Sequence, residues 1–376
     1  MNWKTEGLKR FDSIFGRLGC LVAKLMVNPR KESHNGDPRI LVIRPGGIGD
    51  AALLYPALSE LRKNFPGSRI DVLAEKRNGG ILEGCPFISD LILYDYRPHE
   101  TLYGVMKRHY DIVIDTEQWH RLTAALSYLT GASVRAGFET NERAELFTLP
   151  VKYSESDYEV LSFLNLISAV TGKNHEFDEN EPFIPVDAGG DNALAQSISE
   201  FGKSKKAVAG MFTGATIRER RWGVEKFARL SGELSAEGIG TVIVGGGADE
   251  RDALRFKEIA GNEHVLDFTG KTSLMETASI ISLLNLFVTG DTGLMHVAYG
   301  VGTPTVSLFG AGIQGKWAPP GDNHIAINKR VPCSPCTKFG YTPPCPYHVR
   351  CLSEITVEEV RESVIELLSY SPVKSN

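Results

Sequence analysis

The sequence predicts an α/β protein made of two doubly wound, Rossmann-like domains. Three observations predict this class. Short apolar runs alternate with helical segments along most of the 376 residues. The alternation weakens once, between about residues 150 and 191. Each half also places a glycine-containing loop directly after an apolar run. Apolar strands separated by helices form parallel sheets that are covered on both faces, and two such domains leave a central cleft between the carboxyl ends of their strands.

The composition is that of a soluble globular protein. The chain is 42% hydrophobic and 23% charged, with a formal net charge of −5, so no nucleic-acid partner is expected. No apolar run reaches the roughly 20 residues that span a bilayer. Charges at Lys9, Arg10 and Arg17 interrupt any signal-peptide core. We therefore expect a cytoplasmic protein.

Residues 1–37 are predicted to be a separate segment, with a basic amphipathic helix followed by a polar linker. This helix either lies on an anionic surface, making the protein peripheral on the inner face of the cytoplasmic membrane, or docks on the first domain. Its apolar positions are Trp3, Leu8, Phe11, Ile14, Phe15 and Leu18, with Lys4, Arg10, Arg17 and Lys24 between them.

Residues 38–190 are predicted to form the first domain, and residues 191–376 the second. The first has expected strands at 40–43, 70–73, 91–94 and 112–114, and a helix at 50–64. The second has expected strands at 207–211, 241–244, 265–266, 286–288 and 305–308, and helices at 224–236, 250–260, 274–282, 294–299 and 356–370. Thr356 and Glu359 stand at capping-box spacing at the start of the last helix.

The first glycine loop follows the strand at 40–43. Gly47, Gly49 and Ala52 fit a G-x-G-x-x-A dinucleotide fingerprint, and Glu75 ends the next strand. The loop is either a tight turn or part of an NAD(P)-dependent oxidoreductase. Asp50 lies where the helix begins, so it is either the helix N-cap or a general base for an inverting glycosyl transfer.

The second domain contains the sharpest motif, Gly290-Asp291-Thr292-Gly293-Leu294-Met295-His296. A strand ends, a small-residue loop follows, and a helix begins, which is an arrangement suited to a diphosphate. We expect the donor to contact Asp291, Thr292, Gly293 and His296.

Two further strand ends in this domain supply donor-site candidates. Thr213, Gly214 and Ala215 are followed by Arg220, whose guanidinium could stabilise a departing diphosphate without a metal. Asp249 or Glu250, after Gly245-Gly246-Gly247, could accept hydrogen bonds from ribose hydroxyls. For the acceptor, polar residues after a strand end of the first domain suggest the stretch from Glu117 to Arg121, together with Arg143.

The chain resembles the heptosyltransferases of glycosyltransferase family 9 from about Arg39 to Tyr370. The resemblance rests on Ile43 to Asp50, on Gly290 to His296, and on Gly302-Thr303-Pro304-Thr305 leading into Leu308-Phe309-Gly310. It implies a GT-B fold and inverting, metal-independent transfer of heptose from ADP-heptose to the lipopolysaccharide inner core, with no cofactor. It also implies Asp50 as catalytic base and the Asp291 to His296 loop as the diphosphate site. Arg220 stands where the family usually has lysine, and another nucleotide-sugar donor or lipid-linked saccharide acceptor is the alternative.

Four of the six cysteines gather in one stretch, Cys333-x2-Cys336-x8-Cys345-x5-Cys351. In a reducing compartment such a cluster is either a structural zinc site or a set of thiols, rather than a disulfide framework.

Overall fold

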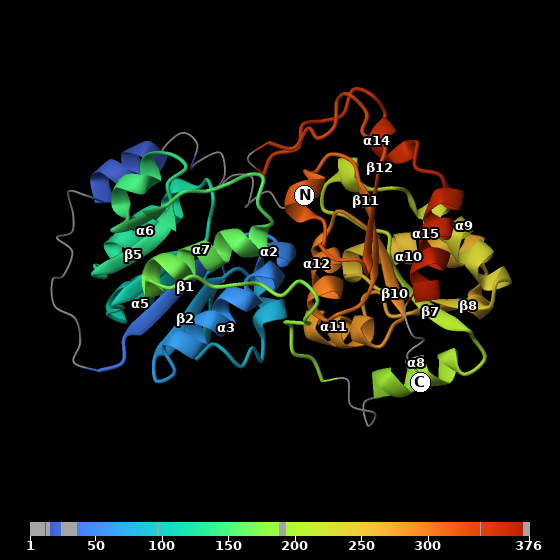
Figure 1. Ribbon diagram of the computed structural model, residues 1–376, viewed down its shortest axis with the longest axis horizontal. Helices are drawn as coiled ribbons and strands as arrows, with labels where there is room; N and C mark the ends of the chain where they lie inside the picture. Colours follow the sequence, from blue (N-terminus) through green and yellow to red (C-terminus); the bar gives the residue numbers. More distant parts are fainter. Residues whose placement is uncertain are drawn as a thin grey trace. The chain divides into compact units, whose positions relative to one another are not determined.

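The chain divides into two compact units, Met1–Phe177 and Asp178–Asn376. The computed structural model describes residues 12, 16–23, 36–95, 98–187, 193–338 and 340–370, apart from the side chain of Asn262. Each unit contains one parallel six-stranded sheet. Figure 1 shows helices on both sides of each sheet. The α/β class with two doubly wound sheets is therefore confirmed.

Unit 1 has the strand order β3-β2-β1-β4-β5-β6. The chain builds one half of the sheet outward from β1 and the other half outward from β4, which is the order of dinucleotide-binding folds. Its elements are β1 (Arg39–Arg44), α2 (Ile48–Leu53), α3 (Tyr55–Asn64), β2 (Arg69–Ala74), α4 (Lys76–Gly79), η1 (Gly80–Leu82), β3 (Asp90–Leu93), α5 (Pro98–Lys107), β4 (Ile112–Asp115), α6 (Arg121–Leu129), β5 (Val134–Phe138), η2 (Glu142–Leu146), β6 (Leu149–Val151) and α7 (Glu159–Thr171).

Unit 2 repeats this order as β12-β11-β10-β7-β8-β9. Its elements are α8 (Ala193–Gly202), β7 (Ala207–Phe212), η3 (Arg218–Arg220), α9 (Val224–Ala236), β8 (Ile239–Ile243), η4 (Gly247–Asp249), α10 (Glu250–Ala260), η5 (Asn262–His264), β9 (Val265–Asp267), α11 (Leu274–Ser282), β10 (Leu286–Gly290), α12 (Gly293–Gly300), β11 (Thr305–Phe309), α13 (Gln314–Trp317), β12 (His324–Asn328), α14 (Arg350–Ser353) and α15 (Val357–Tyr370).

The central strands are buried on both faces. In β1 the residues after Arg39 are all buried, and Leu41 and Ile43 pack with Val105 of α5 in one cluster. Because successive side chains of a strand point to opposite faces, Ile40 and Val42 are buried on the other face. The near-continuous apolar runs that predicted these strands therefore reflect helices on both sides of the sheet.

The helix predicted at 50–64 is two helices, α2 and α3, which meet at Leu54. Pro56 explains the break. Its ring lacks an N–H and clashes with the carbonyl four residues earlier, so a continuous helix cannot pass through it, but it is tolerated in the first turn of α3.

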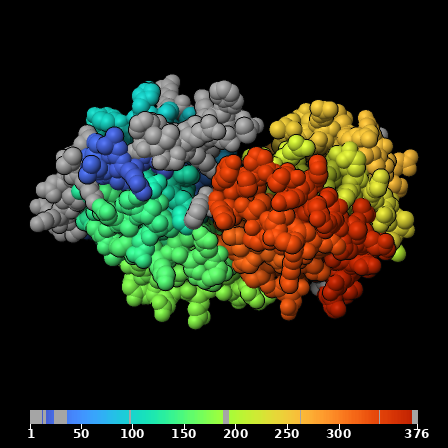
Figure 2. Space-filling view, turned by 90° about the horizontal axis from the view of Figure 1, so that it is seen from above, coloured from blue at the N-terminus to red at the C-terminus, as the bar shows by residue number. Residues whose placement is uncertain are grey.

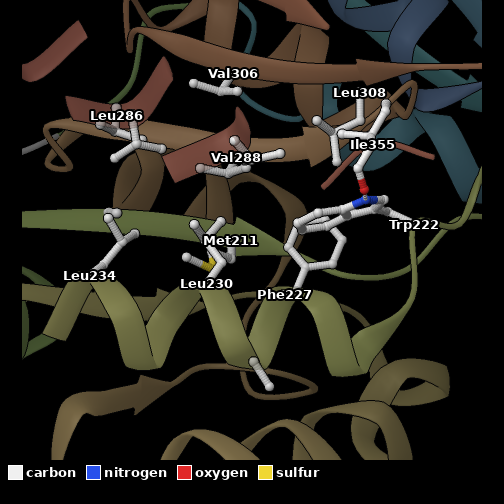
Figure 3. Packing of buried hydrophobic residues seen from close by; sticks show 14 of the residues in the cluster. Met211, Trp222, Phe227, Leu230, Leu234, Leu286, Val288, Val306, Leu308 and Ile355 are labelled. Atoms are coloured by element: carbon white, nitrogen blue, oxygen red, sulfur yellow. Dashed lines mark hydrogen bonds between the residues drawn. The ribbon is translucent and has the colours of Figure 1, made fainter. Parts of the chain in front are cut away.

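The core of unit 2 lies between its sheet and helices α9 and α15. Figure 3 shows Trp222 and Phe227 packed edge to face beside Met211, with ring centroids 4.9 Å apart. The Trp222 indole N–H donates to the carbonyl oxygen of Ile355 at 3.0 Å, just before α15. The capping box predicted for this last helix is confirmed, because Glu359 N–H donates to Thr356 Oγ1 and Thr356 N–H donates to the Glu359 carboxylate.

The units divide after Phe177, earlier than the boundary predicted at residue 190. The segment that follows packs on unit 2. Phe183 and Ile184 both donate their backbone N–H to the carbonyl oxygen of Gly300, and the Tyr299 hydroxyl donates to that of Glu179. The Ile184 side chain is also buried. Residues that lack a helix or strand pattern thus belong to unit 2 through these hydrogen bonds.

Most of the predicted N-terminal segment lies outside the described residues, which include Asp12 and a helical stretch at 16–23. This stretch is docked on unit 1, where the blue atoms near the start of the chain lie in Figure 2. Cys20 and Ala23 are buried against Ala124 and Phe147. Asp12 Oδ1 accepts the backbone N–H groups of Arg121 and Leu122 at 2.8 Å, so it caps α6 from far away in the sequence.

Leu18, Leu21 and Val22 of the same helix remain 57%, 57% and 41% exposed. Docking on the first domain is therefore confirmed for one face of this helix, and the other face presents apolar side chains.

We expect unit 2 to lose stability in mild acid through His324. Burial lowers the pKa of His324 from 6.5 to about 4, and its Nδ1 lies 2.9 Å from Thr305 Oγ1. Above pH 6.5 both the folded and unfolded states hold this histidine neutral. Between pH 6.5 and 4 only the unfolded state takes up the proton, so the free energy of unfolding falls by up to about 3 kcal/mol.

Urea denaturation at pH 7 and pH 4.5 measures this loss. The His324→Gln variant should show a smaller pH dependence by that amount, and equal pH dependence in both proteins would contradict the prediction.

Candidate active site

The candidate site residues of unit 1 lie where its strand order reverses. Strands β1 and β4 are neighbours in the sheet and run parallel, so the loops that follow them lie at the same edge. Asp50 follows β1, and Glu117 and Gln118 follow β4. Open α/β sheets bind ligands at this position, outside the carboxyl ends of the two strands.

The glycine loop after β1 turns the chain into α2. Gly46 has φ of +107°, a backbone conformation that residues with a Cβ rarely adopt. Helix α2 begins at Ile48, its N-cap is Gly47, and no side chain caps it. The N-cap alternative for Asp50 is therefore wrong: Asp50 is the third residue of the helix, where the positive end of the helix dipole stabilises its carboxylate.

The Asp50 carboxylate contacts two partners through one oxygen. Gln118 Nε2 donates to Asp50 Oδ1 across 3.5 Å, and Arg44 Nη1 lies 3.8 Å from the same oxygen. The Asp50 side chain stays 23% exposed, whereas that of Arg44 is 2% exposed. A carboxylate that is held on one side and open to solvent on the other can take a proton from a bound hydroxyl.

The Arg44 guanidinium is fixed at the end of β1. It donates to the carbonyl oxygens of Pro45 and Thr116 at 2.7 and 2.9 Å and lies 3.4 Å from Glu117 Oε2. Burial alone would lower the pKa of Arg44, but the carboxylates of Asp50 and Glu117 more than offset it, so the pKa is raised. Arg44 therefore places a permanent positive charge behind Asp50.

The three acceptor candidates are all engaged by the protein itself. Burial would raise the pKa of Glu117, but the charges of Arg44 and His120 hold it below its usual value. The other Glu117 oxygen accepts the backbone N–H groups of Gln118 and Trp119. Arg121 pairs with Glu142 at 2.7 Å and keeps 17% of its side chain exposed.

Arg143 is fully buried, so the prediction that it contacts the acceptor is not supported by its position. Its Nη2 lies 2.6 Å from Asp115 Oδ2, and neither side chain is exposed to solvent. It also donates to the carbonyl oxygen of Glu117. The polar residues that follow β4 thus hold the loop together, and Arg121 is the most exposed of the three candidates.

The donor candidates of unit 2 also lie at a reversal of strand order. Strands β10 and β7 are parallel neighbours, and β8 flanks β7 on the other side. The loop with Thr213, Gly214 and Ala215 follows β7, the loop with Asp249 follows β8, and Asp291 follows β10. The three predicted donor segments therefore meet at one edge of one sheet.

The N-terminus of α12 is shaped for an anion. Its N-cap is Thr292, whose side chain makes no capping hydrogen bond and lies 3.1 Å from Thr289 Oγ1 instead. No acidic residue occupies the first turn. The first N–H groups of a helix have no partner within it, so those of Gly293 and Leu294 can bind a diphosphate oxygen.

Arg220 forms an ion pair with Asp291, which lies just before this helix. Its Nη1 lies 3.0 Å from Asp291 Oδ2, and the exposed fractions of the two side chains are 20% and 5%. Gly290 allows the close approach, because a Cβ there would come 2.8 Å from the Arg220 carbonyl oxygen. Two residues later, Trp222 anchors the loop in the core (Figure 3). Asp291 is thus paired with Arg220, and its predicted contact with the donor stays a prediction.

The loop after β8 brings a carboxylate close to the Thr213–Ala215 loop. A Cβ on Gly214 would lie 2.5 Å from Asp249 Oδ1, and Asp249 Oδ2 accepts the Gly246 N–H at 2.9 Å. Burial raises the pKa of Asp249. Glu250 is exposed at the start of α10. The carboxylate of Asp249 or of Glu250 could accept a hydrogen bond from a ribose hydroxyl, and that of Asp249 is held in place by its hydrogen bond with Gly246.

His296 is the fourth residue of α12 and is 4% exposed. Its ring packs against that of Trp317, with centroids 6.0 Å apart. His296 is therefore buried against Trp317, and its predicted contact with the donor stays a prediction.

The four clustered cysteines are all free thiols that range from exposed to buried. Within the described part of the chain, no three His, Cys, Asp or Glu side chains are grouped so that they could hold a metal ion. Burial, followed by the neighbouring thiols, raises the pKa of Cys351 to about 11.

We expect iodoacetamide at pH 8 to modify Cys333, which is exposed, and to leave Cys351 unmodified until the protein unfolds. The thiolate is the reactive form, and a pKa of about 11 leaves little of it at this pH. Mass spectrometry of the native and urea-treated protein measures the modification of each of the two cysteines. A zinc ion bound by the four sulfurs would protect Cys333 as well, so slow reaction of both cysteines would contradict the free-thiol state.

Sequence reasoning gave no role to Arg44, which contacts Asp50, or to Glu159, which contacts Gln118, and it included Gln118 only within the stretch from Glu117 to Arg121. Arg44 is a charged residue at the end of a buried strand, and that position was a usable signal. Gln118 and Glu159 are 41 positions apart, and their hydrogen bond of 2.5 Å depends on how α7 packs on the sheet. No local pattern of the sequence indicates that contact.

Comparison with known proteins supplies the family. The profile of glycosyltransferase family 9 (heptosyltransferase) matches residues 102–343. Lipopolysaccharide heptosyltransferase 3 of Escherichia coli is 27% identical over 301 residues, which cover 74% of this chain and 85% of that protein.

Two solved structures share the fold. That of E. coli ADP-heptose lps heptosyltransferase II has a TM-score of 0.70 at 21% identity, covering 88% of this chain and 98% of the other. That of the E. coli heptosyltransferase WaaC with ADP-2-deoxy-2-fluoro heptose has a TM-score of 0.65 at 20% identity, covering 87% and 99%.

The family match spans more than half of the chain, and it replaces the oxidoreductase alternative for the first glycine loop. The two parallel sheets, and the N-terminus of α12 with Arg220 beside it, are consistent with this family. The chain belongs to glycosyltransferase family 9, the heptosyltransferase family, and is a glycosyltransferase.

Proposed function

We propose that this chain is an inverting heptosyltransferase that moves heptose from ADP-heptose to the lipopolysaccharide inner core. The observation that carries the proposal is the N-terminus of α12 with Arg220 fixed beside it by Asp291. The helix N-terminus and the Arg220 guanidinium both place positive charge at the carboxyl end of the same sheet, which suits a diphosphate leaving group. The family membership and the sugar-nucleotide named with the WaaC structure support heptose and ADP as its parts.

In the proposed reaction the acceptor hydroxyl attacks the anomeric carbon of the donor from the face opposite the diphosphate. Asp50 takes the hydroxyl proton as the new C–O bond forms, and the bond between the anomeric carbon and the phosphate oxygen breaks. The released ADP gains negative charge, which Arg220 and the N–H groups of Gly293 and Leu294 stabilise. Configuration inverts because one displacement occurs, and these groups supply the charge stabilisation without a metal.

Thermal-shift measurements with ADP, UDP, GDP and NAD test the donor class. A ligand at 100 times its dissociation constant stabilises the folded state by about 2.7 kcal/mol. We expect ADP to raise Tm more than the other three. A larger shift with UDP or GDP would favour the alternative of another nucleotide-sugar donor, and a larger shift with NAD would contradict the proposal.

The Arg220→Ala variant tests the phosphate contact. It should lose most of the ADP-induced shift and should raise the KM for the donor without changing that for the acceptor. Arg218→Ala is the matched control, because Arg218 is exposed in the same η3 turn. Equal losses on both substrates would count against the assigned role of Arg220.

We also propose that the N-terminal helix brings the enzyme to the inner face of the cytoplasmic membrane, where a lipid-linked acceptor is held. Its exposed residues Leu18, Leu21 and Val22 would enter the headgroup region, and the basic residues of the segment would attract anionic lipid. No described helix is long and apolar enough to cross a membrane.

Sedimentation with anionic vesicles tests this attachment. Leu18→Ser with Leu21→Ser should reduce the bound fraction while thermal stability stays unchanged, because both side chains face solvent. Equal binding by wild type and variant would contradict the membrane contact.

A further inference from the structure

One side-chain amide links two carboxylates beside the proposed base. Gln118 Nε2 donates to Glu159 Oε1 at 2.5 Å and to Asp50 Oδ1 at 3.5 Å. An amide nitrogen carries two hydrogens, so it can serve both oxygens at once. Glu159 is fully buried and Gln118 is 7% exposed. The contact therefore connects the interior of unit 1 with the carboxylate that reaches solvent.

Glu159 is firmly held. It is the first residue of α7, where the positive end of the helix dipole favours a carboxylate. Its second oxygen, Oε2, accepts the Tyr153 hydroxyl at 3.0 Å. Burial, followed by the charge of Glu159, raises the pKa of Tyr153, so this hydroxyl stays a donor. The chain Tyr153–Glu159–Gln118 is thus a fixed support whose last amide hydrogen points at Asp50.

Among the described residues, both polar contacts of Asp50 use the same oxygen. Gln118 and Arg44 meet Oδ1, whereas Oδ2 lies beside Gly47, where an added Cβ would come within 2.9 Å of it. Gly47 has extended backbone angles that any residue can adopt, so the glycine leaves room rather than relieving strain. Oδ1 thus faces its protein partners, Oδ2 lies on the Gly47 side, and the Asp50 side chain as a whole stays 23% exposed.

We propose that Gln118 is a positioning residue that orients the Asp50 carboxylate, with Oδ1 held by the protein and Oδ2 presented to the acceptor hydroxyl. This inference rests on the proposed function of Asp50 as the base. A base contributes most when it is held in the reactive geometry, and a misplacement of about 1 Å can cost 10²-fold in rate. The amide suits the task because it is an uncharged donor between two negative groups.

The Gln118→Met variant tests the proposal in the full-length protein, since methionine keeps the length of the side chain and removes its N–H groups. Transfer is followed as ADP release from ADP-heptose with a lipopolysaccharide-core acceptor. We expect kcat to fall about 10- to 100-fold, and the donor KM and the ADP-induced shift to change less than twofold. Gln196→Met, at an exposed site in α8, is the matched control and should leave kcat unchanged.

A double variant separates positioning from a general structural role. If Gln118 acts through Asp50, adding Gln118→Met to Asp50→Asn should slow transfer no further than Asp50→Asn alone. Losses that multiply would overturn the proposal, and so would full kcat in Gln118→Met. If Gln118→Met does not fold, Gln118→Asn replaces it in the test. The asparagine side chain is shorter by one methylene, so its amide cannot reach both carboxylates. Full kcat in Gln118→Asn would overturn the proposal.

The same measurements distinguish failure of this inference from failure of the proposed function. Wild-type transfer by Asp50→Asn would remove the base and the proposed mechanism with it. Loss of transfer in Asp50→Asn together with full activity in Gln118→Met would remove the positioning role alone.

Discussion

Asp50→Asn should lower kcat for sugar transfer by about 10²- to 10⁴-fold, the usual contribution of a general base. Asparagine keeps the shape of the side chain and cannot take the acceptor proton. Asp50 lies in unit 1 and the candidate nucleotide site lies in unit 2, so the ADP-induced thermal shift should be unchanged. Comparing single-turnover rates with nucleotide-induced shifts measures both effects.

Asp37→Asn is the control for this experiment. Asp37 is exposed just before β1 and Asp50 follows the other end of that strand, so the control should transfer at the wild-type rate. A protein that binds nucleotide and never turns it over would show no difference between the wild type and Asp50→Asn. Transfer by Asp50→Asn within threefold of wild type would mean that another group takes the proton.

Arg143→Met should destabilise unit 1 by about 3–5 kcal/mol. Arg143 and Asp115 form an ion pair at 2.6 Å with no exposed surface on either side chain. Burial is the largest influence on Asp115 and raises its pKa, so its carboxylate depends on the guanidinium for compensation. Removing one partner leaves an unpaired charge in the interior. Urea denaturation followed by far-UV circular dichroism measures the change.

Two further variants show whether the cost comes from the unpaired carboxylate. Arg143→Met with Asp115→Leu should recover much of the stability, because a buried ion pair replaced by apolar residues is often neutral. Arg121→Met removes a partly exposed pair with Glu142 and should cost no more than about 1 kcal/mol. A loss below 1 kcal/mol in Arg143→Met would show that Asp115 finds another partner.

Most of the sheet architecture could be predicted because its signals are local. Strands such as β1 and β10 are continuous apolar runs, and the loops after them carry the glycines that a strand-to-helix turn needs. Strands β5 and β6 of unit 1 were not predicted, because β5 contains Arg135 and β6 is three residues long with Pro150 at its centre. An edge strand such as β6 tolerates proline, so it can lack the apolar pattern.

The candidate donor residues could be predicted as a group but not in their separate roles. Parallel strands bring the loops after β7, β8 and β10 to one edge, and this follows from the alternation of elements alone. The sequence does not show that the Asp291 carboxylate turns back to pair with Arg220, because that depends on the space left by Gly290 and Gly312. Side-chain direction in a loop is set by packing, which one sequence does not display.

The Asp12 carboxylate has a consequence for how membrane attachment can be studied. Asp12 caps helix α6, which begins three residues after Gln118. It therefore connects the N-terminal segment to the turn beside the proposed base. Removing the first 38 residues would delete the proposed lipid contact and the Asp12 cap at the same time, so a loss of turnover in the shortened enzyme would have two causes. Asp12→Ala removes the cap of α6 and leaves Leu18 and Leu21 in place. The serine replacements at those leucines keep the cap and remove the apolar side chains. Comparing the two variants therefore separates an effect on membrane binding from an effect on catalysis.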